Sequence, residues 1–159
     1  MQKEYKGKNL NKKKITHFGY EAITKQEKNK KVNAVFDSVA NNYDLMNNLM
    51  SLGLHHVWKK ILIETTTLKP NSKILDIAAG TADISIEFFK KNKDFEIFHT
   101  DINLSMLKEG KKKLINQGKI TPSILCDAEA LPFPNNYFDC VTIGFGLRNM
   151  TNKERALKE

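Results

Sequence analysis

Hydrophobic residues recur along this chain with two different periods. In the first half, two segments place apolar side chains at steps of three and four residues, which predicts helices with one apolar face. The first segment spans residues 27–43 and the second spans residues 55–65, with a Met- and Asn-rich helix or turn at 44–50 between them. The apolar positions are Val32, Val35, Phe36, Val39 and Ala40 in the first segment, and Val57, Trp58, Ile61 and Leu62 in the second.

After the breaker at Pro70 the pattern changes to short apolar runs that alternate with helical spacing. Strands that alternate with helices are typical of βαβ units, so we expect an α/β fold with a parallel sheet and flanking helices. Thr151 is expected to cap a last helix. The predicted strands are 73–77, 95–100, 123–126 and 137–145, and the predicted helices between them are 83–92 and 105–117.

The first of these strands runs into small residues, Gly80 and Thr81 among them, and then into a helix. Small residues let the backbone approach a ligand closely, and the start of a helix offers N–H groups without intrahelical partners. This arrangement is found in nucleoside-binding folds, although a tight turn that binds nothing would look the same.

Acidic residues follow the next two strands. Asp101 lies twenty residues after Thr81, where a carboxylate can accept hydrogen bonds from both ribose hydroxyls. Capping of the helix that begins near Asn103 is the alternative role. Asp127 can accept an adenine amino group, and the N–H of Ala128 can donate to a ring nitrogen, unless the segment is an ordinary loop. These strand ends meet at one edge of a parallel sheet, so they predict one nucleoside site.

Dinucleotide binding is the natural competitor, and the spacing of glycines disfavours it. The turn after the first strand holds only Gly80, whereas the dinucleotide fingerprint needs three glycines to admit a pyrophosphate.

The charge of the chain is concentrated at its start. Of the net +8, residues 1–31 contribute +7, from ten Lys and three Glu, so residues 1–15 are expected to form a disordered basic tail. Such a tail can contact anionic lipid, or it can reflect a Lys-rich composition. Specific nucleic-acid binding is disfavoured because residues 1–31 lack Arg.

Cys126 and Cys140 are the only cysteines, which gives neither a disulfide framework nor a metal-binding spacing. We expect both to be small apolar residues in buried strands, and we expect no metal. This cysteine usage fits a reducing cytoplasm, which is the expected location. No apolar stretch is long enough to span a bilayer, and the Lys-rich start carries no apolar run like a signal peptide.

Three motifs resemble those of a known family, the ubiquinone/menaquinone biosynthesis C-methyltransferases, within the class I S-adenosyl-L-methionine-dependent methyltransferases. The resemblance covers roughly residues 16–159, which is nearly the whole chain. The motifs are Thr16-His17-Phe18-Gly19, Tyr43-Asp44-x-Met46-Asn47-x-x-Met50-Ser51-x-x-x-His55-x-x-Trp58, and Phe145-Gly146-Leu147-Arg148-Asn149.

The resemblance implies a Rossmann-like domain over 70–159, a helical substrate or lid region over 16–69, and S-adenosyl-L-methionine as cofactor. It implies cofactor contacts from Thr81, Asp101, Asp127 and Ala128, beside Gly80. The family's last strands have no counterpart here, so a truncated chain is expected. Ala82 stands at a family glycine, and a left-handed backbone there would cost on the order of 1 kcal/mol.

The implied acceptor is the ring carbon of a demethylated polyprenyl quinol, a demethylmenaquinol or a 2-polyprenyl-6-methoxy-benzoquinol. Arg148 follows the fourth strand and is expected to stabilise the phenolate, with Asn149 and Tyr43 completing a polar wall. A surface ion pair is the alternative role for Arg148. His55 and Trp58 either line the entry for the isoprenoid tail or pack into the core, and packing is favoured.

A membrane-dissolved substrate implies peripheral contact with the inner face of the membrane. A homodimer and a quinone-biosynthesis complex are both left open. The alternative function is a truncated, non-catalytic remnant that binds the cofactor or a partner.

Overall fold

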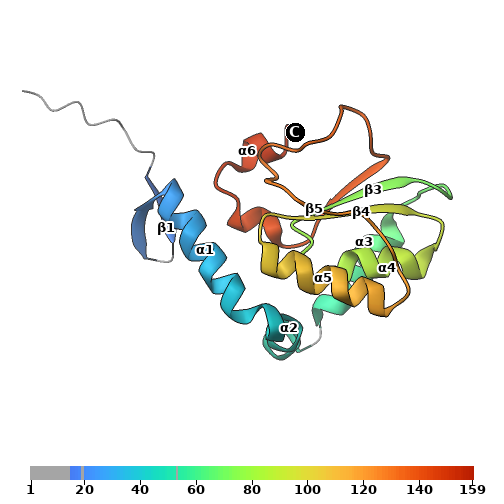
Figure 1. Ribbon diagram of the computed structural model, residues 1–159, viewed down its shortest axis with the longest axis horizontal. Coiled ribbons are helices and arrows are strands. Elements are labelled where there is room, and N and C mark those ends of the chain that lie inside the picture. Colours follow the sequence, from blue (N-terminus) through green and yellow to red (C-terminus); the bar gives the residue numbers. More distant parts are fainter. Residues whose placement is uncertain (1–14, 19, 53) are drawn as a thin grey trace, which may run out of the picture.

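A four-stranded parallel sheet forms the centre of the molecule, with the strand order β5–β4–β3–β6 (Figure 1). The computed structural model describes residues 15–18, 20–52 and 54–159. The predicted α/β class is confirmed, because all three strand pairings are parallel. The strands are β3 (Lys73–Ile77), β4 (Glu96–Asp101), β5 (Ser123–Leu125) and β6 (Cys140–Ile143).

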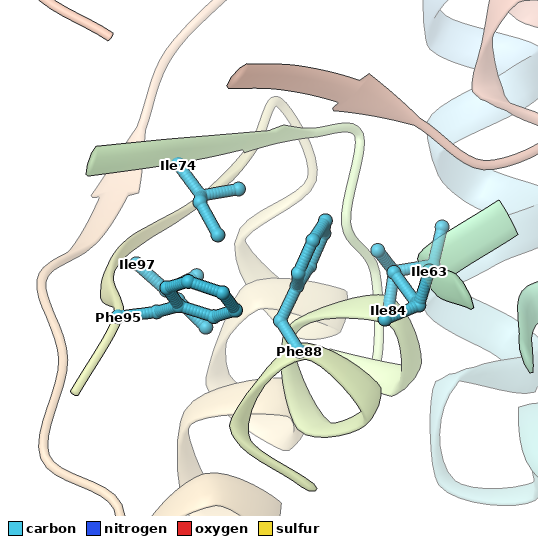
Figure 2. Packing of buried hydrophobic residues seen from close by; sticks show 6 residues of the cluster. All are labelled: Ile63, Ile74, Ile84, Phe88, Phe95 and Ile97. Carbon is cyan, nitrogen blue, oxygen red and sulfur yellow. The ribbon is translucent and has the colours of Figure 1, made fainter. Parts of the chain in front are cut away.

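Three helices lie on one side of this sheet, and the C-terminal segment with α6 (Lys153–Ala156) lies on the other (Figure 1). The three are α3 (Leu54–Thr65), α4 (Asp83–Lys91) and α5 (Leu104–Asn116). Figure 2 shows the main apolar cluster on the helical side, where Phe88 of α4 packs between side chains of the sheet and of α3. This packing fixes α4, and therefore the turn that precedes it, against β3.

Aromatic rings cover the other side of the sheet. Phe138 packs edge-to-face against Phe98 and Phe133, with ring centroids 5.2 and 4.9 Å apart. The prediction of a strand over 137–145 is wrong at both ends, since β6 spans only Cys140–Ile143. Phe138 precedes the strand, and the backbone of Phe145 turns left-handed at φ 63°, which ends it.

The first half is helical, as predicted, but it begins with a hairpin that the sequence pattern did not indicate. Strands β1 (Ile15–Phe18) and β2 (Glu21–Thr24) pair antiparallel, and Thr24 then caps α1 (Lys25–Val39) through a capping box with Glu27. A 3₁₀ turn, η1 (Ala40–Asn42), leads into α2 (Tyr43–Ser51). Four-residue strands are too short to show a period. The predicted disordered tail lies, except for residue 15, outside the described residues.

Helix α3 buries a different face from the predicted one. Its buried residues are His55, Lys59 and Ile63, whereas Trp58 and Ile61 are each 54% exposed. The inward face is polar because Lys59 pairs with Asp83 at the start of α4. The preferred expectation of core packing is therefore right for His55 and wrong for Trp58.

The last helix is capped by a neighbour of the predicted residue. The side chain of Asn152, and not that of Thr151, accepts a hydrogen bond from the N–H of Arg155. Adjacent Thr and Asn residues are both good helix caps, so sequence alone does not choose between them.

Candidate functional site

The turn between β3 and α4 holds an unusual backbone. Ala78, Gly80 and Ala82 all have positive φ, at 51°, 55° and 66°. Only glycine adopts this conformation without cost, and each alanine adds on the order of 1 kcal/mol of strain. The left-handed geometry considered for Ala82 is confirmed, and the same geometry at Ala78 is an addition. Such strain persists only where surrounding contacts hold it.

Hydrogen bonds from β4 hold this turn. The N–H of Gly80 donates to Asp101 Oδ2 at 2.8 Å, and the N–H of Ala79 donates to the Thr100 carbonyl at 2.9 Å. The Gly80 carbonyl accepts from His99 Nε2 at 3.1 Å. The turn and the end of β4 therefore form one rigid unit.

Asp101 is buried at the end of β4, and both of its carboxylate oxygens accept backbone N–H groups. Oδ2 accepts from Gly80, and Oδ1 accepts from Asn103 at 2.8 Å. Burial raises the pKa of this carboxyl, and the N–H donors oppose that rise. The alternative role of Asp101 as helix cap is wrong, because the side chain of Asn103 caps α5 by accepting from Met106. The N–H of Ile102 also bonds this carboxylate, whose roughly four lone pairs still leave room for a ligand hydroxyl.

The loop after β5 completes the edge. The N–H of Cys126 donates to the Asp101 carbonyl at 3.0 Å, which places this loop beside the end of β4. The carboxylate of Asp127 accepts from the N–H of Glu129 and is exposed, while Ala128 is half-buried. An exposed acidic acceptor next to a backbone N–H is the pair of groups that an adenine edge needs.

These strand ends line a single open cavity, which we call the first cavity, with an empty volume of about 980 Å³ including its mouth. Helix α1 closes part of it, held there by a hydrogen bond of 3.0 Å from Asn103 Nδ2 to Asp37 Oδ1. The structure thus brings together seven of the eight predicted site residues. They are Tyr43, Gly80, Asp101, Asp127, Ala128, Arg148 and Asn149.

Thr81, the eighth, is buried and lines an adjoining second cavity between α2, α3 and the turn. Tyr43, Gly80 and Arg148 line both cavities, so the two spaces meet at these residues. The remaining lining of the second cavity includes Ser51, His55, Trp58 and Lys59.

A buried ion cluster joins three helices at the second cavity, which Lys59 and Asp83 both line. The carboxylate of Asp83 in α4 contacts the ammonium groups of Lys59 in α3 and Lys113 in α5. Burial raises the pKa of Asp83, but the two lysines more than offset this, so the pKa lies below its ordinary value. The sequence pattern does not indicate this cluster, because buried lysines are rare and the partners lie far apart in the chain.

Asp76 is a buried acid that sequence analysis did not single out. Its Oδ2 accepts from the N–H and hydroxyl of Ser85 at 3.1 and 2.7 Å, and burial raises its pKa to about 7. Thr142 Oγ1 lies 3.4 Å from Oδ1. The side chain therefore keeps its proton to a higher pH than an exposed Asp does, and it joins β3, α4 and β6 beneath the turn.

We predict that Asp76→Asn stabilises the protein at pH 8 and leaves it nearly unchanged at pH 4. A raised pKa means that the folded protein binds this proton more tightly than the unfolded chain does. The contribution of Asp76 to the free energy of unfolding is therefore complete below about pH 4, and it is lost as pH rises through about 7. Full ionisation of Asp76 lowers the free energy of unfolding by on the order of 2–4 kcal/mol. Urea unfolding of both proteins from pH 4 to 8 measures it. A difference in unfolding free energy that does not grow with pH would contradict this assignment.

Cys126 and Cys140 are free and half-buried, not fully buried as predicted, and burial raises the pKa of both thiols. Among residues 15–18, 20–52 and 54–159, no helix could cross a membrane, and no three His, Cys, Asp or Glu side chains gather as metal ligands.

The chain is similar in sequence to the proteins of one known family. The model of the ubiE/COQ5 methyltransferase family matches residues 24–159. A ubiquinone/menaquinone biosynthesis C-methyltransferase from Paraburkholderia phymatum is 58% identical over 145 residues, which are 91% of this chain and 60% of that protein. The chain thus spans 60% of the length of this curated relative.

Solved structures share the fold at low identity. A methyltransferase from Aquifex aeolicus matches with a TM-score of 0.65 at 17% identity, over 77% of this chain and 64% of the other. The cyclase SpnF matches with a TM-score of 0.69 at 18% identity, over 81% of this chain and 53% of the other. At such identities the likeness confirms the Rossmann-like fold and carries no activity.

Proposed function

Because the chain belongs to the ubiE/COQ5 methyltransferase family, we propose that it binds S-adenosyl-L-methionine and transfers its methyl group to a ring carbon of a demethylated polyprenyl quinol. One observation carries the proposal: three strand ends, at Gly80, Asp101 and Asp127, line one cavity. The percentage identity to the Paraburkholderia enzyme supports the same reaction.

The hydrogen-bonding groups that line the first cavity fit an adenosine. Asp101 accepts from the ribose hydroxyls, because its two oxygens carry about four lone pairs and the N–H groups of Gly80, Asn103 and Ile102 do not occupy them all. Asp127 accepts from the adenine amino group, and the N–H of Ala128 donates to the ring. Gly80, which lines both cavities, and Thr81, which lines the second, would hold the amino-acid end of the ligand.

The sulfonium of the bound cofactor supplies an electrophilic methyl group, so the chain must orient and activate a carbon nucleophile. Arg148 lines both cavities, and its permanently cationic guanidinium stabilises the phenolate form of the quinol. Tyr43 lines both cavities as well, and Asn149 lines the first, so the two supply polar contacts around the same ring.

The second cavity suits the acceptor, a demethylmenaquinol or a 2-polyprenyl-6-methoxy-benzoquinol. The rings of Trp58 and Phe145 lie 6.2 Å apart at this cavity, and both are about half exposed. They provide an apolar entry for an isoprenoid chain. Exposed apolar residues on α2 and α3 support peripheral contact with the inner membrane face; they are Leu45, Leu49, Val57 and Ile61.

A cytoplasmic location, and assembly as a homodimer or within a quinone-biosynthesis complex, stay predictions. So does the division into a tail, a helical region over 16–69 and a Rossmann-like domain over 70–159. The alternative function is cofactor or partner binding without catalysis. It is favoured by the edge position of β6 in the described sheet, where Val141 is 56% exposed.

Calorimetry with S-adenosyl-L-methionine, followed by a labelled-methyl assay on a short-chain demethylmenaquinol and on the benzoquinol, tests the proposal. We expect saturable 1:1 binding, no binding of a nicotinamide dinucleotide, and label in at least one quinol. Failure to bind the sulfonium compound would overturn the proposal. Binding without label transfer to either quinol would favour the non-catalytic alternative.

A further inference from the structure

His99 is fully buried in the middle of the site's supporting layer, yet its side chain is polar. Its Nε2 lies 3.1 Å from the Gly80 carbonyl oxygen, and its Nδ1 lies 3.3 Å from the hydroxyl of Ser123. A carbonyl only accepts, so Nε2 carries the hydrogen and donates it to Gly80. The neutral ring then accepts at Nδ1 from Ser123. Burial lowers the pKa of His99, which favours this neutral form.

His99 and Asp101 act on the same residue from the same face of β4. Alternate residues of a strand project to the same side. His99 and Asp101 are two residues apart, so both side chains reach the turn. Asp101 accepts from the N–H of Gly80, and His99 donates to its carbonyl. Both peptide planes that flank Gly80 are thereby fixed, at a residue whose φ is 55°.

Helix α5 leaves a gap for this contact at Gly110. A Cβ built on Gly110 would lie 2.5 Å from the Gly80 carbonyl oxygen and 2.7 Å from His99 Nε2. Glycine therefore lets α5 pack directly on the imidazole and on the carbonyl that it holds. A side chain at position 110 would force the imidazole or the carbonyl to move.

The peptide between Gly80 and Thr81 transmits the effect to the ligand side. In a planar trans peptide the C=O and N–H bonds point in opposite directions. Since His99 draws the Gly80 carbonyl toward α5, the N–H of Thr81 points away from α5. We propose that His99 is a positioning residue, which sets the orientation of the Gly80–Thr81 peptide for the cofactor without touching it. The part that concerns the cofactor rests on the proposed function.

Substitutions that differ in one hydrogen-bond donor test this role. His99→Leu removes the donor, and His99→Gln restores it, because the amide nitrogen of Gln occupies nearly the place of Nε2. Ile97→Val is the matched control, since Ile97 is buried on the same face of β4 and lies two residues from His99. Should the Leu variant fail to fold, His99→Met fills similar space without a donor.

Two readouts are measured: amide hydrogen exchange of Gly80 and Thr81 in the ligand-free protein, and the Kd for S-adenosyl-L-methionine. We expect the Leu variant to exchange these amides at least tenfold faster and to raise the Kd five- to tenfold. The Gln and Val variants should stay within threefold of the unmodified chain in both readouts.

Unchanged exchange of these amides in the Leu variant would overturn the inference, whether or not the chain binds the cofactor. Equal losses in the Leu and Gln variants would also overturn it, because the donor would then be irrelevant. A third outcome is faster exchange in the Leu variant together with no cofactor binding by the unmodified chain. It would support the role of His99 in positioning the Gly80–Thr81 peptide and would overturn the proposed function instead.

Discussion

Arg148→Ala is expected to lower turnover about 100-fold or more while changing the Kd for S-adenosyl-L-methionine less than threefold. Arg148 lies in η2 (Gly146–Asn149) and lines the first and second cavities where they meet. A cation in this place acts on the phenolate of the acceptor, whose charge is greatest as the ring carbon becomes nucleophilic. Loss of that cation therefore removes stabilisation of the reacting state and leaves the adenosine contacts intact.

The alternative for Arg148, a surface ion pair, finds no support in the part of the chain that the structure describes, where no carboxylate lies within 4.0 Å of its guanidinium. Arg155→Ala is the matched control, since Arg155 of α6 pairs with Glu159 beyond the helix and lines neither cavity. Arg148→Lys should recover part of the turnover, because it restores charge without the planar fork. Turnover and cofactor affinity that fall together in Arg148→Ala would show that the residue serves binding alone.

The sheet and the ends of its strands were predictable because their signals are local. The apolar run that ends in Ile77, the small residues up to Ala82 and the acid at Asp101 each lie within one short segment. Parallel pairing then brings the segments to one edge without any knowledge of side-chain packing. The site could therefore be assembled from strand ends alone.

The features that were missed depend on partners far away in the chain. Lys59 appears solvent-facing in the sequence, but its partner Asp83 lies 24 residues further along and turns the helix face inward. The imidazole of His99 bonds Gly80 and Ser123, at separations of 19 and 24 residues. Periodicity reports which face of an element is apolar, and it carries no information about buried polar pairs.

Asp101→Asn is expected to raise the Kd for S-adenosyl-L-methionine about 100-fold and to destabilise the fold by about 1–3 kcal/mol. The reason is that the carboxylate accepts N–H donors on both of its oxygens. Gly80 and Asn103 each direct an N–H at a different carboxylate oxygen, both at 2.8 Å. An amide has one oxygen, so its NH₂ group must face one of these N–H donors. Either the Gly80 turn or the start of α5 then loses its acceptor, whichever way the amide is oriented.

Asp127→Asn separates this effect from a simple loss of charge. Asp127 is exposed and accepts one backbone N–H, so its amide can turn its oxygen toward Glu129 and keep that bond. We expect unchanged stability and a Kd raised less than tenfold, measured by thermal unfolding and calorimetry. If both variants weakened binding equally and left the fold equally stable, Asp101 would act through its charge alone. The double hydrogen bond would then have no part in shaping the site, because only a residue that holds the turn should couple affinity to stability.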